Sequence, residues 1–120
     1  EAGAVVGIVA AGGAGSVIDV RTDPEVQQAH VPGSRHILLD TIPARMDEIR
    51  RTPAPRLLLC HVGERAEMAR RFLESKGVTA CQTIRGGIDA YVRAGGEVVG
   101  GAPGAALDGG ACAASNPADA

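Results

Sequence analysis

Aromatic residues are nearly missing from this chain of 120 residues, which holds one phenylalanine, one tyrosine and no tryptophan. Proteins that bind single-stranded nucleic acids stack the bases on aromatic side chains, so this mode of recognition is not expected here. The formal net charge of −2 offers no basic surface to a phosphate backbone or to an anionic membrane. We therefore expect an aliphatic core, no nucleic-acid partner and no membrane partner.

Cysteine is also scarce, and the three residues Cys60, Cys81 and Cys112 form neither a disulfide framework nor a metal-binding pattern. No Cys-x-x-Cys pair is present, so we expect no metal and no cofactor. No apolar run is long enough to span a bilayer. The apolar stretch Ala4–Ala11 is short and is preceded by a glutamate instead of basic residues, so no secretory signal is expected. These absences favour a reducing compartment, the cytoplasm.

The length fits one domain with a single core. We divide the chain into an apolar, glycine-rich segment over residues 1–15, a domain over residues 16–99 and a tail or linker over residues 100–120. The tail has little apolar bulk, which predicts disorder and an exposed Cys112. Residues 5–9 fit either a short helix or an early strand, because periodicity does not decide between them.

Short strands and helices alternate along the domain, which predicts an α/β fold: an open parallel sheet of four to five strands with helices on both faces. Strands are expected at residues 16–21, 57–60 and 78–84, and a short strand or extended segment at residues 37–39. Helices are expected at residues 23–29, 41–51, 65–76 and 88–94. Asp23 as the N-cap before Pro24 is typical of a helix start. Val98 and Val99 are expected to pack back on the body, and Cys81 to lie in the core or half-buried in the sheet.

The chain is organised around Leu57–Arg65, an apolar strand that ends in Cys60 and leads through a short loop into a helical pattern. Open α/β sheets carry their binding sites at the carboxyl ends of the strands. A helix N-terminus presents unpaired N–H groups and the positive end of its dipole, which favour Cys60 as a nucleophilic thiolate. The N–H groups of residues 61–65 can form a nest for an anion on the sulfur, with Gly63 permitting the curl and Arg65 adding a cation. The alternative interpretation is that Cys60 has no catalytic role and packs at the strand end as a small hydrophobic residue.

The pattern Cys-x-x-Gly-x-Arg between a strand and a helix resembles the active-site loop of the rhodanese (sulfurtransferase) family. Asp19–Arg21 resembles the family's Asp-x-Arg motif, and Ala29–Ser34 resembles its Gly-His-Ile-Pro-Gly-Ala motif with alanine in place of the first glycine. Arg85–Tyr91 resembles the Gly-Gly-x-x-x-Trp stretch that closes these domains, with Tyr91 at the tryptophan. The resemblance covers residues 16–99 and implies the rhodanese-like fold.

The resemblance also implies a sulfurtransferase that moves a sulfane sulfur from thiosulfate or a persulfide to a thiol or cyanide acceptor. Cys60 would be the catalytic residue and would carry the sulfur as a persulfide. The loop residues expected to bind donor and persulfide are His61, Val62, Gly63, Glu64 and Arg65. The partners would be a small-molecule donor and a thiol acceptor, or an acceptor protein, with the chain acting as a monomer.

Two loop residues leave their roles open. Arg65 would orient the donor or hold the loop, and it could equally form a salt bridge at the helix start. His61 is either a cation near the donor or a solvated side chain. Glu64 puts a negative charge at the mouth of the loop, which predicts that thiosulfate is only a weak surrogate for a persulfide.

Three other functions compete with the sulfurtransferase. The first is a non-enzymatic module of the same fold that binds a partner or carries sulfur for another enzyme. A phosphatase or arsenate reductase is disfavoured, because the related Cys-x5-Arg phosphatases place the arginine six positions after the cysteine and this chain places it five after. A redox sensor would need Cys81 or Cys112 to form a disulfide with Cys60.

Overall fold

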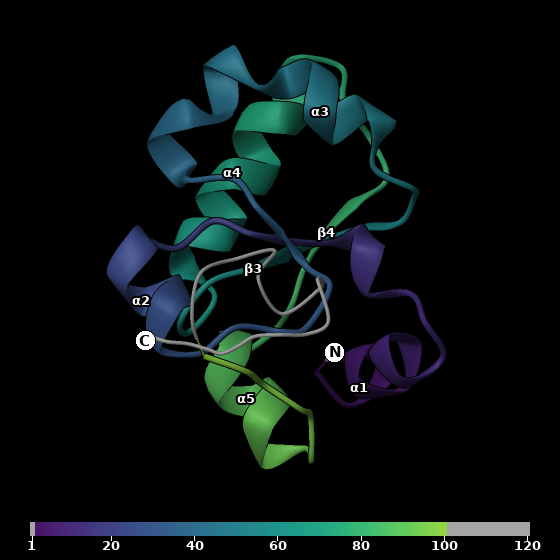
Figure 1. Ribbon diagram of the computed structural model, residues 1–120. Helices are drawn as coiled ribbons and strands as arrows, with labels where there is room; N and C mark the ends of the chain where they lie inside the picture. Colours follow the sequence, from purple (N-terminus) through teal and green to yellow (C-terminus); the bar gives the residue numbers. More distant parts are fainter. Residues whose placement is uncertain (1, 101–120) are drawn as a thin grey trace.

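An open parallel sheet runs through the middle of the molecule, as the computed structural model in Figure 1 shows; the structure describes residues 2–100. The strands stand in the order β2-β1-β3-β4 and all neighbours are parallel. They are β1 (Val17–Asp19), β2 (Arg35–His36), β3 (Arg56–Leu59) and β4 (Cys81–Thr83). The α-helices are α1 (Ala2–Ala10), α2 (Asp23–Gln28), α3 (Met46–Arg51), α4 (Glu64–Ser75) and α5 (Gly87–Arg93). Two 3₁₀ helices complete the fold, η1 (Ala14–Ser16) and η2 (Leu39–Ala44).

Side chains of β3, and of Cys60 just after it, alternate between two cores, one on each face of the sheet. Leu58 and Cys60 point into the core that η2, α3 and α4 cover, while Leu57 and Leu59 point into the core that α1 and α5 cover. Successive residues of a strand face opposite sides, so an uninterrupted apolar run is needed when both faces are buried. In Figure 1, α3 and α4 lie above the sheet and α1 and α5 below it. The predicted α/β fold with helices on both faces is confirmed.

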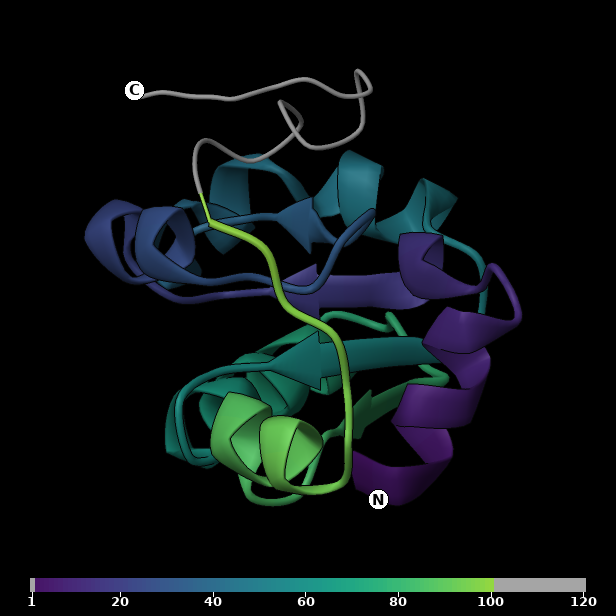
Figure 2. The same ribbon diagram turned by 60° about the horizontal axis from the view of Figure 1, so that its bottom comes forward.

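Residues 5–9 form part of a helix, α1, rather than a strand. Val5 and Ala2 of this helix are buried in the lower core, where α1 packs against α5. The segment after α5 then runs back across the sheet, as Figure 2 shows. There Val99 exchanges two backbone hydrogen bonds of 2.8 Å with His30, so the prediction that residues 98–99 pack on the body is confirmed.

Of the two possibilities left open for residues 37–39, no strand forms there; β2 lies just before them, at Arg35–His36. Two local predictions were wrong. The helix expected over residues 41–51 is divided into η2 and α3. Pro43 lies inside η2, and a proline has no N–H for the hydrogen bonds of an α-helix, so the α-helix begins only after it. The N-cap of α2 is Thr22 rather than Asp23.

The predicted tail over residues 100–120 lies outside the described residues except for Gly100, and so does Cys112. Within residues 2–100, no helix is long and apolar enough to cross a membrane.

Candidate active site

Cys60 follows the last residue of β3 and lies just before α4, as the sequence predicts. Its residue surface is only 1% exposed. The sulfur accepts hydrogen bonds from the backbone N–H of Gly63, at 2.9 Å, and of Ala66, at 3.4 Å. Gly63 is the N-cap of α4 with φ +113°, a left-handed conformation that glycine adopts at least cost. The loop therefore curls around Sγ and directs two N–H groups at it.

The nest of N–H groups differs in detail from the prediction. Of residues 61–65, Gly63 alone donates to Sγ among the described contacts, and the second donor, Ala66, lies one residue beyond the predicted range. Ala66 is in the first turn of α4, where backbone N–H groups have no partner within the helix. The helix N-terminus thus contributes directly to the environment of the sulfur.

The start of α5 holds the same loop from the other side. The N–H of Ile88 donates to the carbonyl oxygen of Cys60 at 2.9 Å, and the N–H of Asp89 donates to that of His61 at 3.4 Å. Gly87 has φ +61°, and a Cβ built on it would lie 2.3 Å from both of these carbonyl oxygens. The second glycine of the predicted Gly-Gly motif is therefore required by this close approach.

Arg65 forms a bidentate ion pair with Glu25 of α2, with N–O distances of 2.7 Å and 2.9 Å. Both side chains are about one third exposed, at 31% and 32%. The guanidinium lowers the pKa of Glu25 from 4.5 to about 2, and the carboxylate raises the pKa of Arg65. Of the roles left open for Arg65, the structure places it in a salt bridge that ties the loop to α2.

Glu25 lies in the first turn of α2. Its carboxylate accepts hydrogen bonds from the N–H and hydroxyl of Thr22, the residue that caps α2. The spacing of these two residues is the sequence signal of a capping box. Nothing local indicates that the same carboxylate meets Arg65, which lies 40 positions later.

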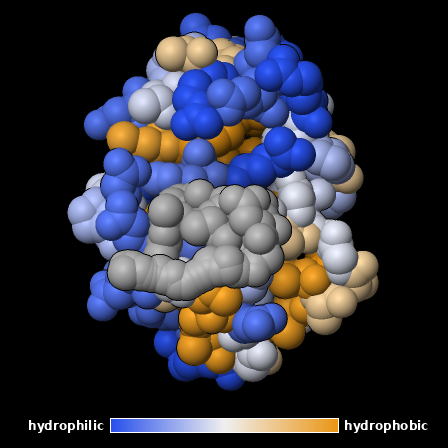
Figure 3. All heavy atoms as spheres, in the orientation of Figure 1, coloured by the Kyte–Doolittle hydropathy of each residue, from blue (hydrophilic) through white to orange (hydrophobic). Residues whose placement is uncertain are grey.

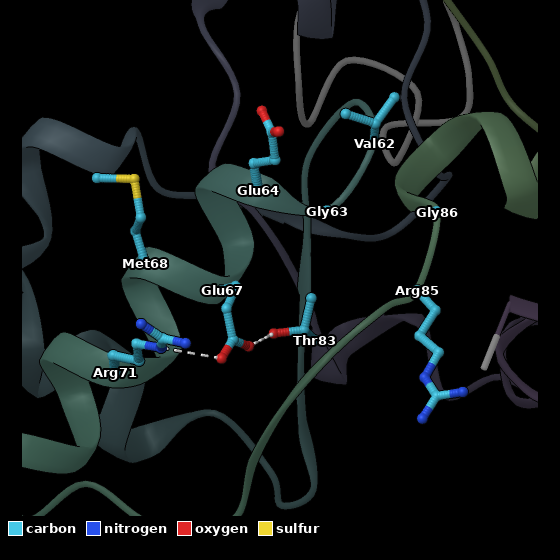
Figure 4. A pocket seen from close by; sticks show the side chains of 9 residues that line it. All are labelled: Val62, Gly63, Glu64, Glu67, Met68, Arg71, Thr83, Arg85 and Gly86. Carbon is cyan, nitrogen blue, oxygen red and sulfur yellow. Dashed lines mark hydrogen bonds and ion pairs between the residues drawn. The ribbon is translucent and has the colours of Figure 1, made fainter.

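The rim of the loop is made of exposed side chains. His61 is 55% exposed and places its Nε2 3.1 Å from a carboxylate oxygen of Asp89. Val62 is 51% exposed, and Figure 4 shows Val62 and Glu64 projecting outward from the loop. His61 is thus both exposed and paired with a carboxylate that the sequence analysis did not single out.

Two hollows flank the loop and a third lies near them. One, of about 490 Å³, is bounded by the loop, α4 and the end of β4 (Figure 4). The second, of about 290 Å³, lies where Glu25, His61 and Asp89 meet. The third, of about 320 Å³, is mostly apolar and lies between η2 and α4. Figure 3 shows a hydrophobic strip across the upper half of the same view as Figure 1.

Asp19 and Arg21, the charged residues of the Asp-x-Arg motif, form a buried ion pair of 2.8 Å at the end of β1. Arg21 also donates to the carbonyl oxygen of Ala29, which fixes the chain after α2. His30 is buried as well, with its Nδ1 2.9 Å from the carbonyl oxygen of Val26. These contacts shape the loops next to the site.

Cys81 is half-buried in β4, and burial raises the pKa of its thiol. It pairs in register with Arg56, at the opposite end of β3 from Cys60. Four residues of strand separate the two ends, roughly 13 Å. A disulfide requires Cα atoms within about 7 Å, so Cys81 cannot bridge to Cys60 in this fold. Among residues 2–100, no group of three His, Cys, Asp or Glu side chains is placed to hold a metal ion.

The family follows from comparison with known proteins. The rhodanese-like domain model matches residues 5–94. The chain belongs to the rhodanese-like domain family. A protein of Allochromatium vinosum named sulfurtransferase is 33% identical to this rhodanese-like chain over 85 residues, which are 69% of the chain and 77% of that protein.

Other relatives extend this picture. YrkF of Bacillus subtilis, named as a candidate sulfur carrier, is 36% identical over 62 residues, 52% of this chain and 33% of that protein; the chain thus spans only about a third of YrkF. A rhodanese-related protein of Thermoplasma volcanium has a TM-score of 0.66 at 24% identity, covering 77% of this chain and 90% of that one. A Rhodopseudomonas palustris protein reaches a TM-score of 0.74 at 18% identity, covering 82% and 81%. Both solved structures show the shared fold.

Proposed function

We propose that this rhodanese-like domain is a sulfurtransferase in which Cys60 takes a sulfane sulfur from a donor and passes it to an acceptor. The observation that carries the proposal is the pair of backbone N–H groups on Cys60 Sγ, at 2.9 Å and 3.4 Å, where α4 begins. A cysteine that only fills space packs as a small hydrophobe and needs no such donors. The name of the 33% identical relative supports the same chemistry.

The reaction has two displacement steps at sulfur. In the first, the Cys60 thiolate attacks the outer sulfur of the donor, an S–S bond forms, and the donor's own S–S bond breaks. Its electron pair leaves on sulfite when the donor is thiosulfate, or on a thiolate when the donor is a persulfide. In the second step a thiolate or cyanide attacks the outer sulfur, and the electron pair of the broken bond returns to Cys60 as thiolate. Covalent catalysis of this kind divides one transfer into two easier steps.

The loop supplies the stabilisation that both steps need. The N–H groups of Gly63 and Ala66 point at the sulfur that carries negative charge before the first step and after the second. Burial of Cys60 keeps water from competing for these donors. Arg65 ties the loop to α2 through Glu25. In this proposal the exposed residues at the rim, His61, Val62 and Glu64, contact the donor.

We assign no cofactor to the reaction, and we propose that the chain works as a monomer in the cytoplasm, where Cys60 stays reduced. The donor is thiosulfate or a persulfide, and the acceptor a thiol. The likeness to YrkF favours a second function, in which the same Cys60 persulfide is carried to an acceptor protein.

The test is a thiosulfate:cyanide assay that follows thiocyanate. We expect modest turnover in the wild type, none in Cys60→Ser, and wild-type turnover in Cys81→Ser, the matched control at the far end of the sheet. Undiminished turnover in Cys60→Ser would contradict the mechanism. A protein that acquires a persulfide but transfers it to no small acceptor would be the sulfur carrier.

A further inference from the structure

Two basic side chains of the active-site loop, Arg65 and His61, each have a carboxylate as their partner among the described residues. Glu25 binds Arg65 with both oxygens, at 2.7 Å and 2.9 Å. Asp89 lies 3.1 Å from Nε2 of His61. A third candidate, the buried Arg21 at the end of β1, is held by Asp19. The mouth of the loop therefore has little net positive charge.

The hollow beside His61 has the same balance of charge. It has a volume of about 290 Å³, and its lining includes Arg21, Glu25, His61 and Asp89 together with the apolar side chains of Ile88 and Val92. On the opposite flank Glu64 is exposed. Figure 4 shows the guanidinium of Arg85 directed away from Val62 and Glu64, so it does not supply the missing cation at the mouth.

Two kinds of donor differ sharply in the charge that they bring. Thiosulfate carries two negative charges within two bonds of the transferred sulfur, so three like charges meet when it approaches the Cys60 thiolate and separate again as sulfite leaves. A protonated thiol persulfide, R–S–SH, brings no charge to the reacting sulfur, and R–S⁻ leaves with the electron pair of the broken S–S bond. A site that favours thiosulfate needs a free cation, and a persulfide site does not.

We propose that Glu25 and Asp89 are specificity-determining residues: they place one carboxylate against Arg65 and one against His61, and so select thiol persulfides over thiosulfate. This inference rests on the proposed sulfurtransferase function and adds the class of donor. Glu25 and Asp89 bind Arg65 and His61 rather than the sulfur, so both act through the side chains that they bind.

The experiment compares kcat/KM for thiosulfate with kcat/KM for 2-hydroxyethyl persulfide, a donor whose R group carries no charge. We expect the wild type to prefer the persulfide. Glu25→Gln and Asp89→Asn should each raise the thiosulfate:persulfide ratio by about fivefold at low ionic strength, the size of one exposed charge interaction. The gain should shrink at high salt, because salt screens exposed charges.

The matched control is Glu48→Gln. Glu48 makes the same bidentate contact with Arg45, at 2.9 Å and 2.7 Å, near Arg35 at the amino end of β2, the edge of the sheet opposite Cys60. Its ratio should equal that of the wild type. Loosening of the loop in Glu25→Gln would lower both rates and leave the ratio unchanged, so the ratio separates specificity from stability.

The two proposals fail in different ways. A wild type that gains no sulfur from either donor, as seen by intact-protein mass, would overturn the sulfurtransferase itself. A wild type that gains sulfur but prefers thiosulfate, or variants with an unchanged ratio, would overturn the assignment of Glu25 and Asp89 while the function stands.

Discussion

Gly87 stands where α5 meets the active-site loop, and alanine at this position tests how tightly the two are packed. The added Cβ would lie 2.3 Å from the carbonyl oxygens of Cys60 and His61 and 2.5 Å from the carbonyl carbon of His61. All of these are backbone atoms, so no flexible side chain can move aside. The same residue has φ +61°, which alanine adopts only with strain.

The expected loss of stability has two contributions, the crowding of the added Cβ and the backbone strain. A left-handed conformation costs a residue with a Cβ about 1–2 kcal/mol. Forcing an extra carbon into a packed site costs about 1–3 kcal/mol more. We therefore expect Gly87→Ala to lower the free energy of unfolding by about 2–5 kcal/mol, a large share of the about 5–15 kcal/mol of a typical domain.

Urea unfolding is measured for Gly87→Ala and for Gly77→Ala. The difference between their losses of unfolding free energy gives the cost of the contacts that the Cβ at position 87 makes. Gly77 has a similar φ of +84°, but a Cβ there would have no atom within 4 Å, so only the strain remains. Gly87→Ala should also slow persulfide formation, because the carbonyls of Cys60 and His61 must move, and Gly77→Ala should not. Equal losses of stability in the two variants would refute the close packing of α5 on the loop.

Three further changes test the ion pairs and the closing segment. Because the pKa of Glu25 is about 2 instead of 4.5, its ion pair with Arg65 stabilises the fold above pH 4.5, and this stabilisation is lost as the pH falls toward 2. The difference in urea midpoint between the wild type and Glu25→Gln should therefore be largest at pH 7 and vanish at low pH. A difference that stays constant with pH would contradict this. Asp19→Asn leaves the buried Arg21 without its counter-charge and should cost about 3–5 kcal/mol in guanidinium unfolding, whereas a loss below about 1 kcal/mol would exclude an essential pair. Tyr91→Phe removes the 2.9 Å hydrogen bond to the carbonyl oxygen of Glu97 and should cost about 0.5–1.5 kcal/mol in thermal unfolding; no change would show that the bond contributes nothing.

The local sequence pattern was sufficient to predict β3 and α4, the strand and the helix on either side of the active-site loop. Three leucines before Cys60 predict a strand buried on both faces, and the run of helical spacing up to Gly77 predicts α4, which ends at Ser75. Pro43 should have limited the helix expected over residues 41–51, since its missing N–H is visible in the sequence.

The partners of the loop could not be predicted in the same way. Arg65 meets Glu25 and His61 meets Asp89 because α2 and α5 pack beside the carboxyl end of β3, and no short-range spacing reports such a contact. The second N–H on Cys60 depends on the curl of the loop, which is set by the carbonyl contacts with α5. The sequence therefore predicts which residues form the loop, but it does not predict which carboxylates pair with Arg65 and His61.

Intact-protein mass spectrometry after incubation with thiosulfate, and separately with glutathione persulfide, addresses the role of Cys60 directly. The wild type and Cys81→Ser should gain one sulfur atom, about 32 Da, which cyanide removes, and Cys60→Ser should gain none. An adduct that persists in Cys60→Ser, or a wild type that gains no sulfur from either donor, would contradict a sulfurtransferase that works through Cys60.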